Sequence, residues 1–150
     1  MAPAQTSLLA KLDTQERVRD FLTNAVASGR ASHAYLFLGA PGAGKLDAAW
    51  ALAQAFLCEQ DGCGSCDSCV RVARHTHPDV HYYTPESATG YLIVQTRELL
   101  DDVPLAPIRA KGKVYIIDRA EQLRANTANA LLKTLEEPPE GVMFILLGTS

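Results

Sequence analysis

The apolar positions of the chain fall into short runs that alternate with segments of helical spacing. Runs of strand length, apolar on both faces, cover residues 35–38, 114–117 and 142–147, and residues 80–84 alternate as a strand does. Apolar residues recur at helical spacing within 18–26, 45–57, 95–103 and 128–135. This alternation of strands and helices predicts an α/β domain of three layers, with a mostly parallel sheet and helices on both faces.

Polar and helix-breaking residues define where these helices start and stop. Asp13 followed by Glu16 resembles a capping box, and Gly29 ends the apolar pattern that follows. Pro104 ends the helix predicted at 95–103, and Pro138 with Pro139 ends the one predicted at 128–135. We find no internal repeat and no low-complexity segment.

Composition and charge narrow the class of protein. The chain of 150 residues is 47% apolar and 21% charged, as expected for one ordinary soluble domain. Its formal net charge of −3 excludes a domain-wide basic field for nucleic acid, so any DNA contact must be local or made by partners. Neither a signal peptide nor an apolar stretch of the ~18 residues that a membrane helix needs is found, so we expect a cytoplasmic protein without a membrane partner.

Residues 39–45 (GAPGAGK) match seven positions of the phosphate-loop pattern, directly after a predicted strand and opening a helix. Glycines let the backbone wrap phosphate oxygens, and the lysine reaches the outer phosphates of ATP or ADP. The candidate nucleotide-binding residues are Gly39, Pro41, Gly42, Ala43, Gly44, Lys45 and Leu46. The alternative is a glycine-rich turn with a solvent-facing lysine.

Two positions of this candidate site lack the expected chemistry. Leu46 stands where Ser or Thr supplies a hydroxyl to Mg²⁺, and a hydrocarbon cannot coordinate a hard cation. Asp118 follows an apolar strand and would hold the same metal. In the ATPases that this element resembles, a glutamate directly after the aspartate orients the attacking water, whereas here the next residue is Arg119. Glu121 lies on the following turn. We therefore expect Mg²⁺ binding to be doubtful, Asp118 to be vestigial and ATPase activity to be weak or absent.

All four cysteines lie within twelve residues, as Cys58, Cys63, Cys66 and Cys69. Four thiolates at this spacing predict a closed, structural zinc site in an inserted loop, residues 58–69. An iron–sulfur cluster or a redox pair remains an alternative. The nearby His75, His77 and His81 are expected in loops or at the surface, with at most one of them in the metal's outer shell.

Several distinctive segments follow one another along the chain: residues 32–37 (SHAYLF), the phosphate loop, the cysteine module, residues 77–80 (HPDV) and residues 129–139 (NALLKTLEEPP). Together they resemble bacterial clamp-loader ATPase subunits. The resemblance covers roughly residues 14 to 150, and the run that ends in two prolines is its most specific part. The spacing between Cys58 and Cys63 is shorter than the family pattern.

The resemblance implies an AAA+ domain whose N-terminal part is residues 1–150, with lid and collar domains absent from this chain. It implies a role in loading the sliding clamp onto primed DNA, with the gamma/tau and delta subunits as partners. It places Thr149 and Ser150 at the first sensor and makes Asn129 and Lys133 candidate DNA-facing residues, although a solvated lysine and a helix-start asparagine explain them equally well.

Three functions remain open. Leu46 and Arg119 favour the delta-prime branch, a largely non-hydrolysing scaffold subunit, over the gamma/tau motor branch. A nucleoside monophosphate kinase also opens with this glycine loop. Such kinases continue the lysine with Gly-Thr and place their cysteines far downstream, whereas here the cysteines follow the loop's helix at once.

Overall fold

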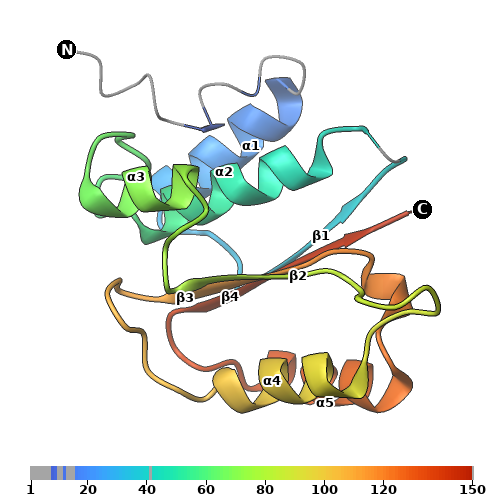
Figure 1. Ribbon diagram of the computed structural model, residues 1–150. Helices are drawn as coiled ribbons and strands as arrows, with labels where there is room; N and C mark the ends of the chain where they lie inside the picture. The colour runs from blue at the N-terminus through green and yellow to red at the C-terminus, as the bar shows by residue number, and fades with distance from the viewer. Residues whose placement is uncertain (1–7, 10–11, 13–15, 41, 150) are drawn as a thin grey trace.

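The computed structural model describes residues 8–9, 12, 16–40 and 42–149, and within them four strands form one parallel sheet. The strands are β1 (Ala34–Leu38), β2 (Val80–Tyr83), β3 (Lys113–Ile117) and β4 (Val142–Gly148), in the order β1-β4-β3-β2. The helices are α1 (Glu16–Ala27), α2 (Lys45–Leu57), α3 (Asp67–Ala73), α4 (Ile93–Asp102) and α5 (Ala125–Glu136), with a short 3₁₀ turn, η3, at Ala120–Gln122. Helices α1, α2 and α3 cover one face and α4 and α5 the other (Figure 1).

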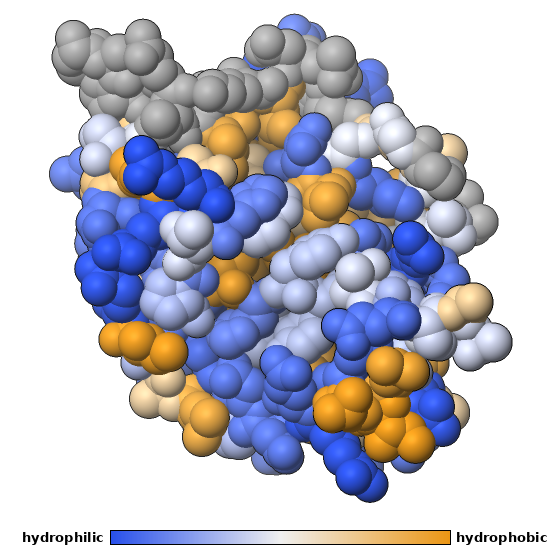
Figure 2. All heavy atoms as spheres, in the orientation of Figure 1, coloured by the Kyte–Doolittle hydropathy of each residue, from blue (hydrophilic) through white to orange (hydrophobic). Residues whose placement is uncertain are grey.

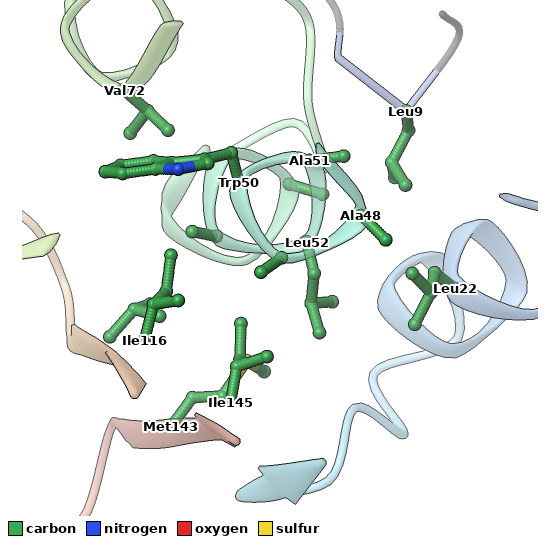
Figure 3. Close-up of a cluster of buried hydrophobic side chains, with 14 of the residues drawn as sticks. Leu9, Leu22, Ala48, Trp50, Ala51, Leu52, Val72, Ile116, Met143 and Ile145 are labelled. Atoms are coloured by element: carbon green, nitrogen blue, oxygen red, sulfur yellow. The ribbon is translucent and has the colours of Figure 1, made fainter. Parts of the chain in front are cut away.

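The sheet separates two hydrophobic clusters, because successive residues of a strand point to opposite faces. In β3, Val114 and Ile116 pack beneath α2, whereas Tyr115 and Ile117 pack against the α4 and α5 side. The alanines of α2 are buried in the same cluster, and Leu52 points from α2 toward the sheet, where Ile145 and Met143 lie (Figure 3). The three-layer α/β fold predicted from the alternating pattern is confirmed.

Two features differ from the sequence prediction. Helix α3 was not predicted, because a helix of seven residues inside a cysteine-rich segment shows little periodicity. Phe21 belongs to the apolar pattern predicted at residues 18–26 and was expected on the buried face of that helix. Its side chain is 64% exposed, while Leu22 and Val26 of the same helix are buried. The predicted cap Asp13 lies outside the described residues.

Strand β1 lies at an edge of the sheet, and its Leu36 and Leu38 are exposed. A parallel strand at an open edge offers unpaired backbone groups to a further segment of protein. Among the described residues, no helix has both the length and the apolar composition to cross a membrane.

Candidate functional site

The glycine-rich loop connects the end of β1 to the start of α2, as the sequence predicts. Gly42 and Gly44 adopt φ values of 83° and 92°, a left-handed conformation in which side chains are strained. Gly44 precedes the first turn of α2, so the free N–H groups of that turn are directed toward the loop. Pro41 lies outside the described residues. The loop geometry fits a phosphate cradle.

The side chain of Lys45 connects the start of the glycine-rich loop to the end of β4. Its Nζ donates to the carbonyl of Gly39 at 2.6 Å and to that of Gly148 at 2.9 Å. The end of β4 therefore borders the loop, and Gly39 N–H also donates to Gly148 O at 3.2 Å. Because an ammonium group has three donors, one remains for a phosphate oxygen.

Leu46 offers no ligand to a metal. Its side chain is partly exposed and lines a cavity of about 320 Å³ together with Leu8, Leu12 and Trp50. The side chain thus faces an apolar environment at the position that, in the phosphate-loop pattern, supplies a hydroxyl to Mg²⁺.

Asp118 follows β3, and both oxygens of its carboxylate are already engaged. The hydroxyl of Tyr82 donates to Oδ2 at 2.8 Å, and the amide of Arg119 donates to Oδ1 at 2.9 Å. Burial, and then the hydrogen bond to Asp118, raise the pKa of Tyr82, so the phenol keeps its proton and remains a donor. Sequence reasoning missed Tyr82 because the contact depends on the β2–β3 register, in which Tyr82 pairs with Ile116.

Arg119, the residue after Asp118, has an unusual backbone conformation. Arg119 has φ 48°, a left-handed value that is uncommon outside glycine. Glu121 lies in η3, and its Oε1 is 3.3 Å from the position that a Cβ on Gly148 would occupy. A carboxylate therefore does approach the end of β4, but from the turn rather than from the residue after Asp118. Thr149 follows β4 and is exposed, and Ser150 lies outside the described residues.

The four cysteine sulfurs form one cluster in which all lie within 4.8 Å of one another. The Sγ atoms of Cys58 and Cys66 are 3.8 Å apart. Four sulfurs at about 2.3 Å from a tetrahedral Zn²⁺ would be separated by about 3.8 Å, so the spacing fits zinc. Backbone amides of Gln60, Cys63, Ser65, Cys66 and Cys69 donate to cluster sulfurs at 3.3 to 3.4 Å.

The cluster holds its thiols in different environments. The Ser65 backbone amide lowers the pKa of Cys63 to about 6, while burial raises the pKa values of Cys66 and Cys69. Binding zinc requires deprotonated ligands, so a cation at the centre is needed to stabilise the buried thiolates together. The chemistry of the donor set therefore suits a structural metal ion.

The three nearby histidines have separate roles, and among the described residues the metal cluster consists of cysteines alone. His75 stacks on Trp50 with ring centroids 3.8 Å apart, and His81 lies 3.2 Å from Asp102. His77 lies in the loop between α3 and β2, as expected, but its side chain is only 4% exposed. Burial lowers the pKa of His77, whose Nε2 lies 3.0 Å from the hydroxyl of Ser68, a neighbour of the ligand Cys69.

Residues 77–80 have a structural role that depends on one buried carboxylate, Asp79. Asp79 is completely buried and accepts hydrogen bonds from the amides of Ile108, Arg109 and Ala110 at 2.6, 2.7 and 2.7 Å. Its own amide donates to His77 Nδ1 at 3.0 Å. Asp79 therefore fixes the loop 104–111, which joins α4 to β3, in place. The sequence drew attention to this segment but gave no role to Asp79.

A polar groove runs between α4 and the start of α5. It has a volume of about 220 Å³, and its lining includes Arg97, Arg124 and Thr127. Both arginines are exposed, whereas Thr127 is only 3% exposed. Asn129 and Lys133 are exposed on α5, on the same stripe that begins at this groove. Sequence reasoning missed the arginines because their proximity depends on helix packing.

The parallel sheet, the glycine loop at the start of α2 and the four-cysteine module define the class: a phosphate-loop α/β domain with an inserted four-cysteine module that could hold a metal ion. A family model described as "DNA polymerase III, delta subunit" matches residues 14–150. The chain therefore belongs to the family of DNA polymerase III clamp-loader subunits that contains delta prime, gamma and tau.

Individual relatives agree with this assignment. Over 90% of its length the chain is 41% identical to DNA polymerase III subunit delta' of Bacillus subtilis and 43% identical to subunit tau of Escherichia coli. It spans 42% of the first and 21% of the second. The two identities are nearly equal, so they do not separate the delta-prime branch from the motor branch. The nucleoside monophosphate kinase alternative does not agree with the family assignment.

Solved structures share the fold. A gamma subunit-related protein of DNA polymerase III from Thermotoga maritima superposes with a TM-score of 0.59 at 21% identity, covering 87% of this chain and 38% of that one. RuvB of Thermotoga maritima superposes with a TM-score of 0.50 at 18% identity, covering 91% of this chain and 37% of that one. At these identities the likeness establishes the fold alone.

Proposed function

We propose that the full-length protein is a delta-prime-type clamp-loader subunit, which takes part in loading the sliding clamp onto primed DNA as a largely non-hydrolysing scaffold. The observation that carries the proposal is Leu46, an apolar side chain at the position where Mg²⁺ needs a hydroxyl. Phosphoryl transfer depends on positioning and on charge stabilisation around this metal. The bond from Tyr82 to Asp118 supports the proposal, because it occupies the remaining carboxylate.

The alternative is an active motor subunit of gamma/tau type. Its support is the 43% identity to a tau subunit and the retained Asp118. A motor would need Asp118 to exchange Tyr82 for Mg²⁺, and would need a substitute for both the residue 46 hydroxyl and the glutamate that Arg119 replaces. Several simultaneous changes are required, so the scaffold role is favoured.

The loop can still bind ATP or ADP without hydrolysing it. Backbone N–H groups at the start of α2 and the third donor of Lys45 suit phosphate oxygens and do not depend on a metal. We infer that any bound nucleotide would be held more weakly than in a motor subunit and would respond little to Mg²⁺.

The cysteine cluster is proposed to hold one structural Zn²⁺ through Cys58, Cys63, Cys66 and Cys69. Four protein ligands leave no open position for water, so the ion would stabilise the module and take no part in a reaction. Its contribution is to hold α3 and the loop before it, whose buried apolar side chains are few.

Protein contacts are proposed to carry most of the function, with the gamma/tau and delta subunits and the sliding clamp as partners. Apolar side chains gather over the start of α4 (lower right in Figure 2), where Ile93 and Val94 are 48% and 64% exposed. An exposed apolar patch of this kind is typical of an interface. The open edge at β1, where Leu36 and Leu38 are exposed, offers backbone groups to a further segment of protein. The proposal that lid and collar domains continue the full-length protein is supported by the 42% and 21% of the delta' and tau relatives that this chain spans.

Reconstitution of the clamp loader tests this role. Loaders assembled from purified subunits without the full-length protein are expected to lose clamp loading onto primed DNA, and adding the protein back should restore it. The measurement is fluorescence energy transfer between labelled clamp and labelled DNA. Loading that proceeds equally well without the protein would rule the scaffold role out.

The groove between α4 and α5 is proposed to contact DNA phosphates, together with Asn129 and Lys133. Replacing Arg97 or Lys133 with glutamine in the full complex is expected to weaken primed-DNA binding regardless of sequence. Each change should lower the slope of log affinity against log salt by about one. Arg74→Gln, at the residue that follows α3 on the other face of the sheet, is the matched control. Salt slopes equal to that of the control would show that these cations do not touch the DNA.

A further inference from the structure

Two cations bridge the cysteine module and the loop 104–111. The two segments face each other across a cavity of about 610 Å³. Arg109 Nη2 donates to Asp67 Oδ2 at 2.8 Å, and Lys111 Nζ donates to the carbonyl of Cys58 at 3.3 Å. Both cations belong to the loop, and both acceptors belong to the module, one of them a cysteine of the cluster.

A second connection between the same two segments runs through the protein interior. Asp79 holds the amides of residues 108–110, its own amide donates to His77 Nδ1, and His77 Nε2 lies 3.0 Å from Ser68 Oγ. Because Nδ1 accepts, the proton of the neutral ring lies on Nε2 and is donated to Ser68. The loop, the buried side chains of His77 and Asp79, and α3 are therefore connected by a closed ring of hydrogen bonds. This ring fixes the positions of Arg109 and Lys111.

A cysteine cluster that holds Zn²⁺ would be negatively charged, and nearby cations would stabilise it. Four thiolates and one Zn²⁺ carry a net charge of roughly −2, since −4 and +2 combine. The module itself contains the carboxylates Glu59, Asp61 and Asp67, and the loop cations Arg109 and Lys111 face it across the cavity. Arg71 already pairs with Asp67 within α3 at 2.9 Å. Arg109 pairs with the same carboxylate at 2.8 Å, so Asp67 offsets only one of these two positive charges, and Lys111 donates to the carbonyl of Cys58. The loop therefore supplies two of the cations beside the module.

We propose that zinc binding and the order of the loop 104–111 are coupled, with Arg109 and Lys111 stabilising the negatively charged zinc–thiolate cluster and the loaded module in turn holding the loop. This inference rests on the zinc site proposed above and deepens it. Groups outside the ligand set typically change metal affinity by 10- to 100-fold. Because both cations are exposed, we expect the lower end of that range.

Competition with a chromophoric zinc chelator, on the full-length protein, measures the first half of the coupling. The double variant Arg109→Met/Lys111→Met is expected to bind zinc about tenfold more weakly at low salt, with the difference shrinking as ionic strength rises. Arg74→Met removes an exposed cation at the end of α3 for which the structure gives no bond to the loop, and should bind as the wild type does. Equal affinity in the double variant and the wild type would overturn the coupling.

Hydrogen exchange of the amides of residues 108–110 measures the other half. Linkage is reciprocal, so removing zinc from the wild type should accelerate their exchange, and should have little effect in the double variant. Exchange that is unchanged by zinc in the wild type would contradict the proposal. A wild-type protein that binds no zinc would overturn the metal assignment and the coupling with it, and would leave the clamp-loader assignment untouched.

Discussion

Replacing Asp79 with asparagine is expected to lower the free energy of unfolding by about 3 kcal/mol, because three amides lose a charged acceptor in a fully buried position. Asparagine has the same shape, so the loss reports on charge and hydrogen bonding and not on a cavity. Urea denaturation at neutral pH, followed by circular dichroism, measures it. Asp101→Asn, which removes an exposed carboxylate on α4, is the matched control.

The pH dependence of this difference has a definite sign. Burial by itself raises the pKa of Asp79, but the amide bonds from Ala110, Ile108 and Arg109 outweigh it and hold the pKa below its usual value. A carboxyl with a lowered folded-state pKa contributes stability above its unfolded pKa of about 3.9, and this contribution is lost as the pH falls through the folded pKa. The difference between wild type and Asp79→Asn should therefore be constant at neutral pH and shrink below about pH 4. A difference that grew on acidification would contradict the charged role of Asp79.

Removing the metal is expected to have the second large effect. Structural zinc contributes on the order of 10 kcal/mol to the folding of small metal modules, and a loss of only a few kcal/mol lowers the melting temperature of a domain of this size by about 10 °C. Chelation, or the change Cys66→Ser, should therefore lower the melting temperature by at least about 10 °C and release one zinc per chain. Differential scanning calorimetry with elemental analysis of the same samples measures both quantities.

Ser65→Ala provides the control for the metal experiment, because it keeps all four sulfurs and the backbone amide that donates to Cys63. This variant should retain zinc and melt close to the wild-type temperature. Iron in place of zinc would support the iron–sulfur alternative. A protein that melts at the same temperature with and without metal would show that the cluster does not stabilise the fold.

The strands and longer helices could be predicted because their apolar spacing is local information. Helix α3 could not, and its start shows why. The N-cap is Cys66, whose sulfur accepts from the amide of Cys69, a role that usually falls to an oxygen of Ser, Thr, Asp or Asn. In the four-cysteine module a sulfur thus takes the place of the usual capping oxygen, and rules based on polar caps do not detect it.

The candidate site was predictable where one segment supplies all its parts. The phosphate loop and the cysteine cluster are contiguous in sequence, so their spacing was enough to locate them. Two of the contacts that were missed join distant segments of the chain. The hydrogen bond from Tyr82 to Asp118 and the hydrogen bonds from the amides of residues 108–110 to Asp79 each connect residues about 30 positions apart or more. Such contacts depend on which strands are neighbours and on the register between them. The hydrophobic pattern of the sequence gives neither the strand order nor the register.

ATP turnover by a clamp loader that contains this protein, with the phosphate loop of every other subunit disabled, tests the central claim most directly. The assembled complex, with clamp, primed DNA and Mg²⁺, is expected to hydrolyse no ATP above background, since Leu46 supplies no oxygen to the metal and Arg119 replaces the water-orienting carboxylate. Magnesium-dependent turnover that disappears when Lys45 of this protein is changed to alanine would contradict the claim.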